Sequence, residues 1–493
     1  MMRRRSPADR IPEANTRRRF ILPAGPMLLL LTAVLAPPVG MSAVAWRVAG
    51  LAAWMALWWL TAIIPLEATA LLPIVLLPLL MQRPIGEVTA SYADPIIFLF
   101  LGGFFLAATL ERWDLHKRFA LAAVRIAGTD AARVLLAFML ASAFLSMWIS
   151  NTATAVMMLP IATAVTSGIG RSTDGPDAPH SGLPVALLLG VAYSCSIGGV
   201  ATLIGTPPNA IFAGAARQLL DIDMGFGRWM GLGLMVSVPM LAGCWFLLVR
   251  LCGVKGHVPE LDEMLEREGA MLGPLAGAEK YILAVFIATA SAWVFRAPKL
   301  IGDVRIPGLA DLVPGLTDTG IAIGAALLLF VIPLPQARYG VALNWESAKR
   351  VPWGILLLFG GGLALAAGFA ESGLTEWIGG RLQGLQGAPT LVIYLVTAAM
   401  FVFLTELTSN TATAALGMPL IAGAAGGLGV EPLPLMAVAA IASSMAFRLP
   451  VATPPNAIVF GSGRLQVSDM MRAGWWLNVA AIFVITFAVA LWV

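Results

Sequence analysis

The pentapeptide Ser-Asn-Thr-Ala-Thr occurs twice in this chain, and that repetition constrains the fold more than any other feature. The first copy begins at Ser150 and the second at Ser409. Flanking glycines and a proline keep the same displacement: Gly102-Gly103 matches Gly361-Gly362, and Pro160 matches Pro419. The chain is therefore built from a duplicated unit, and each copy keeps polar residues inside apolar surroundings.

A second motif follows each copy. Thr206-Pro207-Pro208-Asn209-Ala210-Ile211 recurs as Thr453-Pro454-Pro455-Asn456-Ala457-Ile458. The interval between these copies is shorter because only the first half carries a polar loop, residues 171–177, between its two motifs. Two successive prolines remove two amide donors and clash with the preceding turn, so each copy predicts a break in a helix.

Composition identifies the environment of these motifs. Of 493 residues, 59% are hydrophobic and only 12% are charged, whereas charged residues make up about a quarter of a typical soluble domain. Apolar runs long enough to cross a bilayer core, about 20 residues each, recur from Ile21 to Val493. They are too long and continuous for barrel strands. The sequence predicts an all-α polytopic membrane protein, and polar helix breaks in such segments are typical of a transporter.

We expect about 11 transmembrane helices and two re-entrant hairpins. The spans are expected near residues 22–40, 44–64, 67–82, 95–112, 183–209 with its break, 229–251, 281–297, 318–334, 353–371, 431–462 with its break, and 473–493. Segments 133–149 and 151–167 are each too short to cross comfortably, so a re-entrant hairpin over 133–167 carries the first Ser-Asn-Thr at its tip. The second hairpin is expected over 389–425.

Charge predicts how the chain is oriented. Residues 1–20 hold seven arginines and form a basic, cytoplasmic N-terminus. The following apolar run lacks a convincing small-residue cleavage site, so we expect a retained first helix rather than a signal peptide. The first helix and first repeat occupy 21–251, a charged cytoplasmic linker 252–280, and the second repeat 281–493.

The two repeats are expected to be inverted relative to each other. The stretch 113–125 is apolar and basic, which suits an amphipathic helix on the cytoplasmic membrane surface. Its counterpart after Gly362 carries Glu371 and Glu376 with a single basic residue, and is expected outside. Inverted repeats with broken helices place a small-molecule site near the membrane midplane.

The hairpin tips offer groups for both an anion and a cation. Each tip exposes backbone amides and the positive end of a helix dipole, which favour an anion. Neutral donors are added by Asn151, Thr152, Asn410 and Thr411. Hard oxygens for a small cation are the Gly205 and Ala452 carbonyls, the Asn151 and Asn410 amide oxygens, and the hydroxyls of Ser150 and Ser409. Ser146 and Thr405 each lie about one helical turn before their motif.

Other interpretations of these residues remain open. Each motif could be a polar cluster that holds helices together, but two identical copies, each followed by its own break, favour a binding site. The glycine pairs indicate close helix packing. Glu406 could carry a proton or bind a cation, although a structural role, hydrogen-bonded to the hairpin, is favoured. Arg448 could neutralise a substrate charge or extend to the membrane interface.

Other function classes fit less well. A channel needs a continuous polar path, whereas inverted hairpins predict occlusion. An intramembrane enzyme needs a nucleophile with a base or a metal cluster, and no histidine lies in a predicted span. Cys195, Cys244 and Cys252 lie in or beside apolar segments, which indicates small buried residues. The net charge of +4 lies in loops. We expect no cofactor and no nucleic-acid partner.

At the doubled Ser-Asn-Thr motif the chain resembles the divalent anion–sodium symporters, carriers of dicarboxylates, citrate or sulfate. The resemblance extends from about Trp46 to Val493. It implies a homodimer in the lipid bilayer, expected in a bacterial plasma membrane, in which a mobile transport domain moves elevator-fashion against a fixed scaffold. It implies symport of sodium with a small dianion, for which a C4-dicarboxylate such as succinate is the first expectation. Sodium-independent exchange, or a sulfate or citrate substrate, remains the alternative within the family.

The resemblance also implies the site residues. One sodium site would use Ser146, Ser150, Asn151 and Gly205, and the other Thr405, Thr408, Asn410 and Ala452. The substrate would meet Ser150, Asn151, Thr152, Ser409, Asn410 and Thr411, together with Thr206, Thr453 and Pro454. Thr408 stands where family members often have a small residue, and its backbone carbonyl would serve there.

Overall fold

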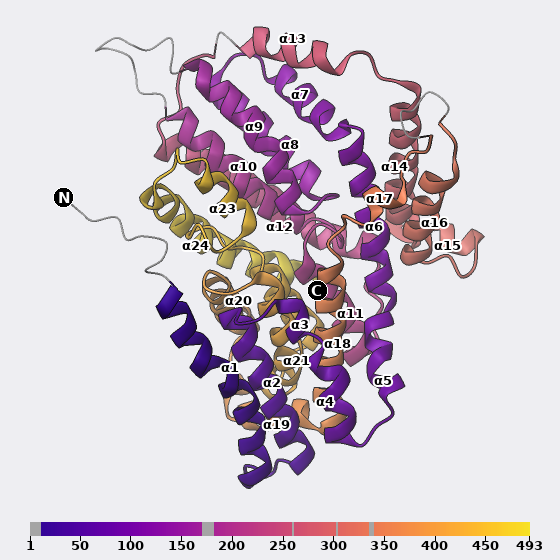
Figure 1. Ribbon diagram of the computed structural model, residues 1–493, viewed down its shortest axis with the longest axis vertical. Helices are drawn as coiled ribbons and strands as arrows, with labels where there is room; N and C mark the ends of the chain where they lie inside the picture. The colour runs from indigo at the N-terminus through magenta and orange to yellow at the C-terminus, as the bar shows by residue number, and fades with distance from the viewer. Residues whose placement is uncertain (1–10, 170–181, 259–260, 302–303, 335–339) are drawn as a thin grey trace, which may run out of the picture.

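The computed structural model describes residues 11–169, 182–258, 261–301, 304–334 and 340–493, and it is mostly helical (Figure 1). The polar loop at 171–177 and the basic residues at 1–10 lie outside the described residues. The first part of the chain forms α1 (Ile11–Val34), α2 (Ala43–Thr61), α3 (Leu66–Thr69), α4 (Leu72–Met81), α5 (Ile85–Ala90), the short 3-10 helix η2 (Ser91–Ala93) and α6 (Pro95–Arg112).

Local sequence explains where these helices begin. The segment predicted as one span over 67–82 forms two pieces, α3 and α4, and Pro73 occupies the first turn of α4, where a proline needs no amide donor. Helix α6 has the bounds that we predicted. Asp94 caps it, since its carboxylate accepts a hydrogen bond from the Ile96 amide at 2.9 Å.

The first hairpin follows a helix of strongly two-sided character, α7 (Leu115–Ala127), in the stretch predicted to be amphipathic. The hairpin consists of α8 (Ala131–Ser146) and α9 (Asn151–Ile169), with Ser150 in the turn between them. Asp130 caps α8 by accepting a hydrogen bond from the Arg133 amide at 2.9 Å. With 16 residues, α8 is about 24 Å long, shorter than a bilayer core of about 30 Å.

Both predicted helix breaks are present. In the first half, α10 (Leu183–Gly199) ends before an unwound segment, and α11 (Pro207–Leu220) resumes at the first proline. In the second half, α22 (Pro432–Ala442) and α23 (Pro454–Gly461) flank the corresponding break. In each case a proline starts the second helix, because its missing amide would have no partner in the first turn. Helices α12 (Phe226–Leu251) and α13 (Leu261–Leu272) connect the halves.

The second half repeats this order of helices. It contains α14 (Gly277–Phe295), α15 (Leu309–Leu312), α16 (Asp318–Val331), α17 (Trp345–Ala348), α18 (Trp353–Ser372), α19 (Leu374–Leu382), η3 (Gln383–Leu385), α20 (Thr390–Thr405), α21 (Asn410–Leu428) and α24 (Val467–Trp492). An antiparallel pair of strands that we did not expect, β1 (Lys299–Ile301) and β2 (Val304–Ile306), lies between α14 and α15. The pair lies in a connection between apolar helices, where hydropathy gives no strand signal. The repeat-related helices α7 and α19 lie toward opposite ends of the long axis (Figure 1).

Seven helices of the described part of the chain are long and apolar enough to cross a membrane. They are α2, α5 with α6, α12, α14, α18, α21 and α24. The limbs α8 and α20 and the first limbs of the two broken helices, α10 and α22, are shorter apolar helices. Length alone therefore separates most full spans from the hairpin and broken segments, although α21 is long enough to span by itself.

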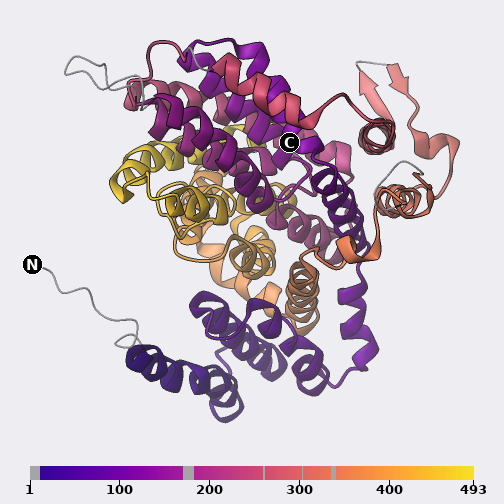
Figure 2. The ribbon, with the colours of Figure 1, turned by 45° about the horizontal axis from the view of Figure 1, so that its top comes forward.

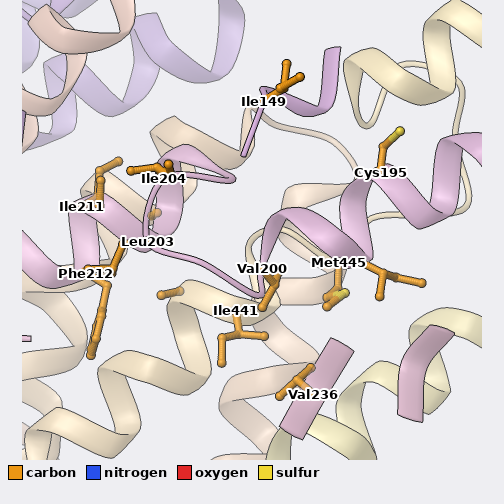
Figure 3. Packing of buried hydrophobic residues seen from close by; sticks show 14 of the residues in the cluster. Ile149, Cys195, Val200, Leu203, Ile204, Ile211, Phe212, Val236, Ile441 and Met445 are labelled. Carbon is orange, nitrogen blue, oxygen red and sulfur yellow. The ribbon is translucent and has the colours of Figure 1, made fainter. Parts of the chain in front are cut away.

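The core is centred on the broken helices. Every residue of α22 from Leu433 to Ala442 is buried, and α10 packs against α8, α9, α12 and α23. Around the first break, Val200 and Leu203 pack among Phe212 and Ile441 (Figure 3). Helices α14 and α16 stand to one side of this core (Figure 2). The glycine pair behaves as predicted, because a Cβ on Gly102 would lie 2.6 Å from the Ala322 Cβ of α16.

Candidate functional site

The first Ser-Asn-Thr motif places three oxygen atoms together beneath its turn. The Ser146 hydroxyl oxygen lies 2.5 Å from the Asn151 Oδ1 and 2.8 Å from the Cys195 carbonyl oxygen. Ser146 and Cys195 are fully buried. A hydroxyl has one proton and can donate to only one of these acceptors. The group therefore has one more oxygen than its protons can satisfy.

The second motif repeats this arrangement. The Thr405 hydroxyl oxygen lies 2.7 Å from the Asn410 Oδ1 and 2.8 Å from the Ser443 carbonyl oxygen. Clusters of neutral and carbonyl oxygens are ligands for hard cations. Groups of three or more His, Cys, Asp or Glu residues that could hold a metal are absent from the described residues. The two oxygen clusters thus suit a weakly held monovalent cation better than a transition metal.

At two glycines, the backbone of the first break lies so close to the first oxygen cluster that a side chain would not fit. A Cβ on Gly199 would lie 2.3 Å from the Asn151 Oδ1, and one on Gly205 would lie 2.9 Å from the Ser146 carbonyl oxygen. Gly205, a predicted ligand, therefore does lie beside Ser146. Gly199, Cys195 and Ser443 were not among the predicted site residues. The Gly198-Gly199 pair before the break was a usable signal for Gly199. A backbone carbonyl, as at Cys195 and Ser443, leaves no signature in the sequence.

The asparagine of each Thr-Pro-Pro-Asn motif braces its own break. The Asn209 side-chain amide nitrogen lies 3.0 Å from the Gly199 carbonyl oxygen and 2.7 Å from that of Thr202. At the equivalent positions, the Asn456 nitrogen lies 3.3 Å from the Ala446 carbonyl oxygen and 3.1 Å from that of Leu449. Both asparagines are fully buried. They supply donors to carbonyls of the unwound backbone, where the regular hydrogen bonds of a helix are missing.

In the second half, a buried carboxylate also accepts hydrogen bonds from the backbone of the break. Glu406 is 4% exposed, and its Oε1 accepts hydrogen bonds from the Phe447 and Arg448 amides at 2.9 Å and from the Asn478 side chain at 2.7 Å. Its Oε2 accepts from the Leu449 amide at 3.1 Å. The favoured structural role is thus supported, but three of the four partners lie in the break and the fourth, Asn478, lies in α24, rather than in the hairpin. The Arg448 guanidinium lies over the Trp475 ring, 5.0 Å from its centroid.

The remaining predicted residues are distributed over the two tips and breaks. Thr152 is exposed and Thr411 half-buried, while Thr206 and Thr453 are buried at the starts of α11 and α23. The Thr408 hydroxyl donates to the Leu404 carbonyl at 2.9 Å and lies 2.5 Å from the Thr413 hydroxyl. This leaves its carbonyl as the group that could face a cation. No hydrogen bond in the described residues joins one tip to the other.

A cavity of about 990 Å³ reaches the first tip. Its walls come from the C-terminal half of α6, the start of α9 and the segment that runs from α17 into α18. Ser150 and Thr152 are part of its lining, and its charged residues are Glu111, Arg112, Glu346 and Arg350. The residues of the second tip are not among its lining. This cavity gives a solute access to Ser150 and Thr152 of the first hairpin tip.

Two transporters of known name are similar to this chain in sequence. The chain is 40% identical over 471 residues to the sodium-dependent dicarboxylate transporter SdcS of Staphylococcus saprophyticus, covering 94% of this chain and 89% of that protein. It is 38% identical over 473 residues to SdcS of Staphylococcus aureus strain USA300, with the same coverage.

Solved structures share the fold at low sequence identity. The YdaH transporter of Alcanivorax borkumensis matches with a TM-score of 0.56 at 13% identity, over 82% of this chain and 86% of that one. The Neisseria gonorrhoeae protein MtrF matches with a TM-score of 0.56 at 14% identity, over 95% and 94%. The family model described as the sodium:sulfate symporter transmembrane region matches residues 19–493. The chain belongs to this family of membrane transporters.

Proposed function

We propose that this protein is a secondary active transporter that couples the movement of sodium to that of a C4-dicarboxylate such as succinate. The observation that carries the proposal is the pair of matching oxygen clusters, Ser146–Asn151–Cys195 and Thr405–Asn410–Ser443, one beneath each hairpin tip. Two relatives at 38% and 40% identity are named sodium-dependent dicarboxylate transporters, which supports the same assignment.

Charge explains why an anion site needs cation sites beside it. The tips offer Ser150, Asn151, Thr152 and their repeat partners Ser409, Asn410 and Thr411, all neutral. Desolvating a dianion among neutral groups is costly, and helix dipoles supply only partial positive charge. Two sodium ions, one in each oxygen cluster, would neutralise the dianion locally. Sodium and substrate should therefore bind cooperatively, each raising the affinity of the other by the same factor.

The proposed sodium ligands follow from the clusters. At the first site we propose Ser146, Ser150, Asn151 and Gly205, and the short distance from the Ser146 hydroxyl to the Cys195 carbonyl supports that carbonyl as a further ligand. At the second we propose Thr405, Thr408, Asn410 and Ala452, and the Thr405 hydroxyl bond to the Ser443 carbonyl supports that carbonyl in the same way. The dianion would lie against the tips and the breaks at Thr206, Thr453 and Pro454.

The proposed mechanism is alternating access of the elevator type. The hairpins and broken helices would form the mobile unit, with about 11 spans in total, two inverted repeats, and a cytoplasmic N-terminus in a bacterial plasma membrane. A homodimer would hold the scaffold fixed while the mobile unit carries substrate and sodium together. Helix α11 of the first half packs on α21 of the second hairpin, and α23 of the second half packs on α9 of the first hairpin. This packing between the halves supports movement of both hairpins as one body.

The test is substrate uptake by the purified protein in proteoliposomes. Labelled succinate, citrate and sulfate would be offered across a sodium series at fixed ionic strength, with choline as the replacement ion. We expect succinate uptake that rises with sodium and saturates. Uptake that is independent of sodium but stimulated by dicarboxylate inside the vesicle would reject symport and assign the exchange mode.

A further inference from the structure

We propose that Asp318 is a positioning residue for transport: it latches the start of α12 to α14 and α16 in this conformation, and the latch opens in each transport cycle. The latch consists of the Asp318 carboxylate, its ion-pair partner Arg296 and the backbone amide of Phe226. This inference rests on the proposed function and deepens it, because it names a contact between the mobile unit and the scaffold that must break when the mobile unit moves.

Helix α12 belongs with the mobile unit by its contacts. It packs on α8, α10 and α24, and two of its side chains donate hydrogen bonds to the first broken helix. The Trp229 indole nitrogen donates to the Val200 carbonyl at 3.0 Å, and the Ser237 hydroxyl donates to the Ile197 carbonyl at 2.7 Å. Helices α6, α14 and α16 pack on one another, and α14 and α16 stand to one side of the core (Figure 2). Movement of the first broken helix against these three would therefore pull α12 away from α14 and α16.

The latch lies where the start of α12 meets the scaffold. The Asp318 Oδ2 accepts a hydrogen bond from the Phe226 amide at 2.8 Å, and its Oδ1 accepts one from the Arg296 Nε at 2.6 Å. Arg296 also lies 3.7 Å from the carboxylate of Asp223, in the connection between α11 and α12. The Trp293 indole nitrogen of α14 donates to the Asp318 carbonyl oxygen at 2.9 Å. The scaffold thus holds Asp318 in place, and α12 supplies the amide that can leave it.

An aromatic stack connects the latch to the first hairpin tip. The rings of Phe226 and Trp293 stack with their centroids 4.7 Å apart, and both side chains are fully buried. The Trp148 ring is nearly parallel to both, with its centroid 6.1 Å from that of Phe226 and 6.4 Å from that of Trp293. Trp148 belongs to the same turn as Ser150, which lines the cavity. The contact that holds α12 therefore also holds the first tip in its position beside the cavity.

The latch and the cavity lie at opposite ends of α6. The Thr319 hydroxyl donates to the Pro95 carbonyl at 2.9 Å, so α16 and α6 begin side by side. Glu111 lines the cavity near the other end of α6, a helix of 18 residues that is about 27 Å long. A second contact at the latch end pairs Arg217, in the last turn of α11, with Asp94. The mobile unit is thus held against the scaffold at one end, while the first tip is accessible from the other.

The latch can open because opening leaves no charge unpaired. Asp318 lies in α16 and Arg296 directly follows α14, so this buried ion pair stays together when α12 leaves. What is lost is the charge-assisted hydrogen bond from the Phe226 amide, together with ring contacts of the stack. A loss of this kind changes the ratio of two conformations by about ten-fold or more. The latch therefore favours the conformation that opens to the cavity and still permits the other.

The first experiment holds the latch closed. Gly227 of α12 and Val294 of α14 are neighbours, because a Cβ on Gly227 would lie 3.2 Å from the Val294 carbonyl oxygen. Cysteines at both positions, in a protein with Cys252→Ser, would be bridged by a short bifunctional thiol reagent that reduction cleaves; the two other native cysteines are buried. We expect bridging to abolish succinate uptake by proteoliposomes and reduction to restore it. The matched control bridges cysteines at Arg305 and Asp311, an ion pair between β2 and α15, and should leave uptake unchanged.

The second experiment weakens the latch with Asp318→Asn. KM for labelled succinate would be measured separately for uptake and efflux in proteoliposomes of fixed orientation. The apparent affinity at each membrane face is reduced by the fraction of protein that is not open to that face. We expect KM at the face opposite the cavity to fall by about three- to ten-fold, because that conformation becomes more populated, whereas KM at the cavity face should not fall. Asp311→Asn, at an exposed carboxylate of α15, should leave both KM values unchanged.

The outcomes distinguish the latch from the proposed function. Wild-type protein that transports no dicarboxylate under any sodium condition would reject both. Full transport by the bridged protein would reject the latch alone, because α12 and α14 would then not need to separate. Equal KM changes at both faces in Asp318→Asn would also reject it, since a general structural defect produces no difference between the faces. If Asp318→Asn does not fold, the bridging experiment decides.

Discussion

Replacement of Glu406 by glutamine tests whether the second break is held in place by a buried carboxylate. Oε1 accepts three hydrogen bonds and Oε2 accepts one from the Leu449 amide. Glutamine keeps one acceptor oxygen and presents an NH₂ group to the Leu449 amide, which is also a donor. A buried amide without an acceptor costs about 1–3 kcal/mol, and the remaining bonds lose the strength that the negative charge gives them.

We therefore expect Glu406→Gln to destabilise the protein by about 2–4 kcal/mol, which is less than a typical net stability of about 5–15 kcal/mol and should leave it folded. The affected segment leads to Ala452 and Thr453, so the affinity for sodium should fall as well.

The assay is thermal unfolding in detergent across a sodium series, because a ligand that binds only the folded state raises its melting temperature. The matched control is Glu376→Gln, an exposed carboxylate of α19. If Glu406→Gln has the same melting temperature as the control, and sodium raises that temperature as much as in the wild type, the carboxylate does not support the break.

Three further predictions concern the hairpin tips, one ion pair and one buried histidine. Thr152→Ala and Thr411→Ala should each weaken dicarboxylate binding, by about 1–3 kcal/mol if a charge-assisted hydrogen bond is lost; unchanged affinity in both would mean that the motif only joins helices. Arg217 forms an ion pair with Asp94, whose side chain is 11% exposed, so Arg217→Gln should cost about 1–3 kcal/mol in thermal stability. Adding Asp94→Asn should recover part of that loss. If the stability losses of the two single mutants simply add in the double mutant, Arg217 and Asp94 do not stabilise each other. Burial lowers the pKa of His116, which is 4% exposed; protonation below its ordinary value of about 6.5 should therefore destabilise the α6–α7 corner as pH falls. His116→Gln should flatten the dependence of the melting temperature on pH between about 7 and 5, and an unchanged slope would contradict the assignment.

The helical elements around the site were largely predictable from local sequence. Asp94 and Pro95 mark the start of α6 because a carboxylate cap and a proline both suit a first helical turn. Each Pro-Pro pair marks a break because proline cannot donate to the preceding turn. The span predicted over 67–82 is an apolar helical segment that contains a two-residue turn between α3 and α4, and hydropathy gives little indication of such a turn.

The duplicated sequence also indicated which side chains meet at the two turns. Ser146 with Asn151 and Thr405 with Asn410 are five residues apart on either side of a turn, so local geometry alone brings each pair together. Spacing along the chain is sufficient in such cases, because the backbone between the partners has few alternative conformations once the flanking helices form.

Only the tertiary structure decided which distant groups complete these pairs. The Cys195 carbonyl comes from α10 and the Ser443 carbonyl from the end of α22. Every residue has a carbonyl, so no residue type reveals which carbonyl will lie beside a given side chain. The partners of Glu406 lie in the second break and in α24. These contacts depend on how helices pack against one another, and packing is set by the shapes of many side chains together rather than by any motif.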